Sequence, residues 1–134
     1  MTSEAAVRDA AKALLAAATT SPSHPSGQAY TLGELDALTS KPADYLEVNA
    51  VRRYTEVVRV NPRQGKAAWT VLVGVVTKTE NNAHTLLTKA RMALEYQLLA
   101  VDAVTSTPLE LQPGRPVAPD DGWWSALDAW NFTL

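Results

Sequence analysis

The chain has 134 residues, 46% apolar and 19% charged, with a formal net charge of −2, a composition that excludes a wholly disordered polypeptide and suits one domain. It has no cysteine, which excludes a disulfide framework, a thiol nucleophile and a thiolate metal site. We expect neither a membrane protein nor a sequence-specific nucleic-acid binder, because no apolar run approaches roughly twenty residues and the net charge is not basic.

The first predicted element is an amphipathic helix in residues 3–18. Its apolar side chains recur three and four positions apart and would share one face. Most of them are alanines, so we expect this helix to lie close against a flat surface, which a sheet would supply. The stripe consists of Val7, Ala10, Ala11, Leu14, Leu15 and Ala18.

An irregular arm is predicted over about residues 19–43. Prolines and glycines alternate there with serines and threonines, and "LGELDAL" provides one turn of helix at most. Loops longer than about twelve to fifteen residues are uncommon in compact domains and are usually functional or disordered.

A strong hairpin signal follows. Tyr45–Val60 is rich in β-branched and aromatic residues, "NPRQGK" supplies turn chemistry, and Ala67–Thr77 forms the second strand. The second strand is apolar on both faces, so we expect a central strand covered on both sides. One face would carry Trp69, Val71, Val73 and Val75, and the other Leu72 and Val76.

A second helix is predicted from apolar residues at helical spacing, namely Ala83, Leu86, Leu87, Ala90 and Leu94. Thr77 and Glu80 have the spacing of a capping box at its start. Two short strands would follow, in "LLAVDAV" and "STPLEL".

The C-terminal region is predicted to contain a proline-rich loop at about residues 112–122 and then a last strand. That strand would carry Trp124, Ala126, Trp130 and Phe132 on one face, interrupted by Asp128, and would lie inside the sheet beside the hairpin. The order of elements predicts a single α+β domain, with a mostly antiparallel sheet, a long hairpin and two helices packed on the sheet.

Candidate catalytic groups are few. Neither His24 nor His84 has a second histidine at metal-ligand spacing. The segment "PDDGWW" lacks the further oxygen ligands that a calcium loop needs. Asp120 and Asp121 are therefore interpreted as part of a turn that Gly122 ends. We therefore expect no enzymatic activity, no cofactor and no metal.

The charges are distributed unevenly. Residues 52–66 contain five basic residues and one acidic residue, whereas five acidic residues and only Arg115 occur from Asp102 onward. The basic group could contact phosphates, or it could be the charged, solvated edge of a hairpin.

The sequence from "DYLEVNAVRRY" through "WTVLVGVVTKTENNAHTLLTKARMALE" to "TPLELQPGRPVAPDDGWWSALDAWNFTL" resembles the tail terminator proteins of long-tailed, siphovirus-type phages, particularly those of actinobacteria. The resemblance is one of pattern and size, covers nearly the whole chain from Tyr45 on, and does not extend to residues 19–42.

This resemblance implies a structural protein that forms a hexameric ring on the head-proximal end of the tail tube, in virions assembled in the host cytoplasm. The ring would end tube polymerisation, bind the tail tube protein and the head–tail connector protein, and let genome DNA pass through its lumen without sequence-specific binding. A connector or neck protein of the virion is the alternative. A small-molecule-binding domain with a pocket between sheet and helices is a more distant one, for which Asp128 is the polar candidate.

A ring needs two different patches that meet between neighbours, and opposite charges would set their register. The basic side of the predicted interface comprises Arg52, Arg53, Arg59 and Arg63, and the acidic side Asp120, Asp121 and Asp128, with Trp123 and Trp130 as an aromatic contribution. Salt bridges within one subunit would explain the same charges equally well.

Overall fold

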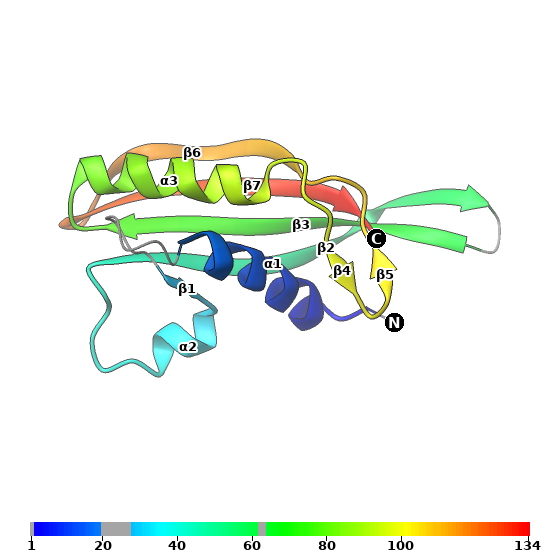
Figure 1. Ribbon diagram of the computed structural model, residues 1–134, viewed down its shortest axis with the longest axis horizontal. Helices are drawn as coiled ribbons and strands as arrows, with labels where there is room; N and C mark the ends of the chain where they lie inside the picture. The colour runs from blue at the N-terminus through cyan, green and yellow to red at the C-terminus, as the bar shows by residue number, and fades with distance from the viewer. Residues whose placement is uncertain (1, 20–27, 62–63) are drawn as a thin grey trace.

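The computed structural model describes residues 2–19, 28–61 and 64–134, and for residues 18, 19, 54–61 and 64–66 it describes the backbone. Its main feature is a five-stranded sheet in the spatial order β1-β2-β3-β7-β6 (Figure 1). The strands are β1 (Gln28–Tyr30), β2 (Asp44–Asn61), β3 (Gln64–Thr77), β7 (Trp123–Thr133) and β6 (Glu110–Asp120).

In this sheet β1 runs parallel to β2, and every other neighbouring pair is antiparallel. Two further short strands, β4 (Ala100–Val101) and β5 (Val104–Thr105), pair with each other apart from the sheet. The predicted α+β class, the long β2–β3 hairpin and the position of the last strand beside that hairpin are confirmed.

Two long helices, α1 (Glu4–Thr19) and α3 (Glu80–Leu94), pack against each other and on the same face of the sheet (Figure 1). On α1 the buried positions Val7, Ala11 and Leu15 are four residues apart, as the sequence predicted. Alanine has no bulk beyond Cβ, so the helix can approach the sheet closely. Each fully buried valine or leucine contributes about 1.5–3 kcal/mol to stability.

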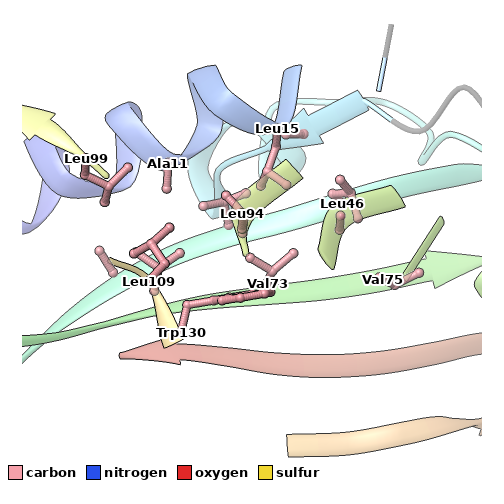
Figure 2. Packing of buried hydrophobic residues seen from close by; sticks show 14 of the residues in the cluster. Ala11, Leu15, Leu46, Val73, Val75, Leu94, Leu99, Leu109 and Trp130 are labelled. Carbon is pink, nitrogen blue, oxygen red and sulfur yellow. The ribbon is translucent and has the colours of Figure 1, made fainter. Parts of the chain in front are cut away.

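The core lies between these helices and the sheet. Figure 2 shows Ala11 and Leu15 of α1 and Leu94 of α3 directed toward Val73 of β3 and Trp130 of β7. Every second residue of β3 from Trp69 to Val75 is buried there. The predicted faces of β3 and β7 are therefore confirmed.

The start of α3 differs from the prediction. Thr79, not Thr77, is the N-cap, and its hydroxyl accepts a hydrogen bond from the Asn82 N–H at 3.2 Å. The Thr77 hydroxyl donates instead to the Thr79 carbonyl at 2.7 Å. Thr77 is the last residue of β3 and faces the core, so its side chain cannot reach the first turn of the helix.

The predicted proline-rich loop at 112–122 is wrong, because most of it is strand β6, which pairs with β7. Strand β6 tolerates prolines because it lies at the edge of the sheet. On its outer side there is no neighbouring strand, so a missing backbone N–H there removes no hydrogen bond between strands. Register shifts occur on either side of Arg115. Asp121 and Gly122 form the two-residue turn between β6 and β7 with φ of 49° and 83°, as the predicted turn at Gly122 requires.

Part of the segment predicted as an irregular arm, residues 19–43, forms regular secondary structure. Residues 20–27 lie outside the described residues, but β1 and the short helix α2 (Leu32–Asp36) follow them. Thr31 caps α2 by accepting from the Glu34 N–H, and Lys12 of α1 binds both carboxylate oxygens of Glu34 at 2.6 and 2.9 Å. This ion pair ties α2 to α1.

Candidate functional site

Both long helices cover the same face of the sheet, so among the described residues no helix covers the other face, which we call the open face (Figure 1). The expectation that β3 is covered on both sides is wrong in this respect. Register places Asn49, Leu72 and Ala129 side by side there, and likewise Glu47, Gly74 and Leu127. Leu72, Val76, Leu127 and Ala129 are partly exposed on this face.

A groove of about 460 Å³ lies on the open face at the end near the β6–β7 turn. Gly74 lies in the middle of its lining, between Glu47 and Leu127 of the neighbouring strands. A Cβ atom on Gly74 would meet its nearest atom, the Glu47 Cβ, at 3.6 Å, an ordinary contact. The backbone therefore has room for a side chain at Gly74, and the glycine contributes to the hollow.

Aromatic side chains form one side of the groove. The Tyr45 ring makes edge contacts with Trp123 at 6.2 Å and with Tyr30 at 6.3 Å between centroids. The Lys78 Nζ lies 3.4 Å from the centroid of the Trp123 ring. Such aromatic pairs contribute about 0.5–1.5 kcal/mol each, so the position of Trp123 is well determined. Burial raises the pKa of the Tyr45 hydroxyl.

Three carboxylates line the groove, those of Glu47, Asp120 and Asp121, together with the cations Lys41 and Arg115. Asp120 and Asp121 are exposed, and Glu47 is partly exposed. Ser125 Oγ donates a long hydrogen bond of 3.4 Å to Asp120. Among the described residues none of the three carboxylates forms an ion pair, so they remain available to a cationic partner.

The predicted interface residues are divided by this geometry. Asp120, Asp121 and Trp123 come together at the groove. Trp130 is in the core at 1% exposure, which removes it from any surface. Asp128 is also buried, at 2% exposure, so its prediction as an inter-subunit residue is wrong.

Asp128 is bound by a residue of its own chain. Arg91 on α3 donates from Nε to Oδ2 at 2.8 Å and from Nη2 to Oδ1 at 2.9 Å. These hydrogen bonds raise the pKa of Arg91. Because both carboxylate oxygens are engaged, Asp128 connects α3 to β7 and does not supply the free polar group that a ligand pocket in the core would need.

The basic residues of the predicted interface lie along the β2–β3 hairpin and do not line the groove. Arg52 and Arg53 pair with Trp69 and Ala68 on β3, and both side chains make further contacts. For Arg59 the backbone is described, opposite Gly65, and Arg63 lies outside the described residues.

Sequence reasoning missed Tyr45, Glu47 and Gly74 as groove residues. The period-two alternation at Tyr45, Glu47 and Asn49 was a usable signal for which side chains share a face. The pairing of β3 with both β2 and β7, however, is what brings them to Trp123.

Among the described residues, no cluster of three or more histidine, cysteine, aspartate or glutamate side chains is arranged to hold a metal ion. None of the described helices has the length and apolarity needed to cross a membrane.

No protein-family model and no curated protein matches the chain. A solved structure of a protein whose name states no function is similar to it, with a TM-score of 0.65 and 11% sequence identity. The alignment covers 98% of this chain and 94% of the other, and a likeness at this identity concerns the fold alone.

Proposed function

We propose that the protein is a non-enzymatic structural subunit of a phage virion, a tail terminator. Its subunits form a ring, hexameric in this proposal, on the head-proximal end of the tail tube, where the ring ends polymerisation and presents a surface to the head–tail connector. Genome DNA passes through the lumen without sequence-specific contacts. The observation that carries the proposal is the open, partly apolar face of the sheet.

An antiparallel sheet with one solvated face normally alternates apolar and polar side chains. Here β3 carries Leu72 and Val76 on its open side, and β7 adds Leu127 and Ala129 beside them. Contiguous apolar surface of this kind marks interaction sites, because covering it removes apolar area from water. A subunit that works inside an assembly has a partner to cover that face.

The β2–β3 hairpin supports the same function. From here on, the arm means the outer part of this hairpin, which consists of β2 after Arg53 and β3 before Ala67. It is a different segment from the irregular one predicted at residues 19–43. The sheet ends at Ala67, whose N–H and carbonyl each bond Leu134 at 3.0 Å, and beyond this point β2 and β3 pair only with each other among the described residues (Figure 1). An isolated two-stranded hairpin is marginally stable in water. Contact with another subunit would stabilise it.

The test combines native mass spectrometry of the purified protein, with and without tubes of the tail tube protein, and negative-stain images. The expected result is a closed ring of six subunits, free or at one end of each tube. A protein that remains monomeric and ignores tubes would contradict the proposal. Rings that bind heads but not tubes would instead indicate a connector or neck protein, the second candidate, which shares these surfaces.

A further inference from the structure

We propose that the arm of one subunit lies in the acidic groove of the next, so that each subunit of the ring donates one arm and receives one. This inference rests on the proposed ring and names the contact that would build it. The occupant of the groove is thus a second copy of this chain, and the contact joins two different surfaces.

The arm cannot reach the groove of its own subunit. Gly65 in the arm and Gly74 in the groove are nine residues apart on the same strand, 74 minus 65, which is about 30 Å at 3.4 Å per residue. Every residue of β3 from Gly65 to Gly74 is paired with β2, so this stretch of β3 is one extended strand. In Figure 1 the arm extends from one end of the sheet, and the β6–β7 turn beside the groove lies at the other. Contact between arm and groove therefore requires two chains.

The charges of the two surfaces are complementary. The arm, as defined, has two basic residues, Arg59 and Lys66, and one acidic residue, Glu56. The groove is lined by three carboxylates, those of Glu47, Asp120 and Asp121, and by two cations, Lys41 and Arg115, so its acidic groups outnumber its basic ones. Complementary charges of this kind guide association and set its register.

The apolar content also matches. The arm sequence has Val57, Val58 and Val60 next to Arg59 in the chain. The groove has Leu72 and Leu127 among its carboxylates. Both partners of the proposed contact thus contain apolar residues beside charged ones.

The geometry has a consequence for assembly. Two different patches at opposite ends of the β2–β3 hairpin form a head-to-tail contact, which closes into a ring when the rotation between subunits allows it. The register shift in β2 between Arg53 and Val57 lies where the arm leaves the sheet. A bulge bends the strand and increases its twist, so this position sets the angle between neighbours.

Charge reversal tests the contact. The groove variant is Glu47→Lys with Asp120→Lys, and the arm variant is Arg59→Glu with Lys66→Glu. Each variant alone is expected to lose the ring seen in native mass spectra of the wild type. Mixed in equal amounts they are expected to form rings again, because every arm then meets a groove of opposite charge in an alternating ring of even number. The control, Asp36→Lys with Glu95→Lys, changes exposed carboxylates outside the groove and should keep the ring.

Two further variants separate contact from folding. Gly74→Tyr fills the groove on a backbone that has room for a side chain, and it is expected to lose the ring with an unchanged circular dichroism spectrum and Tm. The chain lacks cysteine, so Arg59→Cys and Leu127→Cys proteins can be mixed and joined by a short thiol-reactive linker. We expect a dimer of the two variants, and none when Glu95→Cys replaces Leu127→Cys.

The outcomes distinguish the two proposals. Wild-type rings that persist in both charge variants and in Gly74→Tyr would overturn the arm–groove contact and leave the ring standing. A wild-type protein that forms no ring at any concentration, even with tubes, would overturn both.

Discussion

Asp128 of β7 and Arg91 of α3 form a two-pronged ion pair between the sheet and the helix, with Nε–Oδ2 at 2.8 Å and Nη2–Oδ1 at 2.9 Å. The carboxylate is almost fully buried, whereas the arginine side chain is 38% exposed. The pair interrupts the otherwise apolar inner face of β7 and connects it to α3 at one defined place.

Replacing Arg91 by methionine is expected to lower the free energy of unfolding by about 2–4 kcal/mol, because a buried carboxylate loses its partner. The double variant Arg91→Met with Asp128→Leu should recover most of this loss, since two apolar groups have no charge to desolvate. Urea unfolding followed by tryptophan fluorescence measures both. Equal losses in the single and double variants would contradict an energetically coupled pair.

Gly114 of β6 is expected to tolerate no side chain. A Cβ atom there would lie 2.7 Å from the carbonyl oxygen of Leu127, which belongs to the backbone of β7. Gly114→Ala should therefore destabilise the protein by about 1–3 kcal/mol as the strands move apart. The matched control is Gly33→Ala in α2, where a Cβ meets nothing within 4 Å and alanine favours helix. A thermal melt of each variant decides, and similar Tm values for both would refute the steric explanation.

The turn between β6 and β7 depends on backbone conformation and not on space. Gly122 has φ of +83°, and a Cβ there would meet nothing within 4 Å. Gly122→Ala should cost about 1–2 kcal/mol through left-handed strain alone. Asp121→Asn should be close to neutral, because Asn-Gly suits a turn with two positive φ values. Chemical denaturation of both variants checks this, and a neutral Gly122→Ala would show that the turn relaxes.

The Lys12–Glu34 pair predicts a pH dependence. Hydrogen bonding to Lys12 holds the pKa of Glu34 below its ordinary value of 4.5. A carboxyl group whose pKa is lower in the folded state stabilises that state above the unfolded pKa, and this contribution is lost as pH falls through the folded pKa.

Lys12→Met should therefore reduce the loss of stability between about pH 5 and pH 3, modestly because the pair is partly exposed. Unfolding midpoints in urea across this range measure the slope. The same slope in wild type and variant would show that the pair makes no contribution.

The sequence determined much of the architecture. The four-residue spacing of Val7, Ala11 and Leu15 predicts the buried face of α1, and period-two alternation predicts the inner faces of β3 and β7. These patterns report burial directly, because burial selects side chains one face at a time. The pattern also placed Asp128 on an otherwise apolar face, although nothing local indicated that Arg91 would be its partner.

The prediction of a proline-rich loop was wrong because a proline shows only that one N–H is missing. It does not show whether the residue lies on an edge strand, where that N–H is not needed. Pairing with β7 decides this, and it makes residues 110–120 a strand. The position of β6 at the edge of the sheet is a property of the whole topology.

The candidate site divides in the same way. Asp120, Asp121 and Trp123 are neighbours in the chain, and the sequence alone identified them. Glu47 and Gly74 join them only through the register of β2 with β3 and of β3 with β7. One face of β3 remains open because both long helices pack on the other face. The sequence of β3 is apolar on both faces, so it could not show which face the helices would cover.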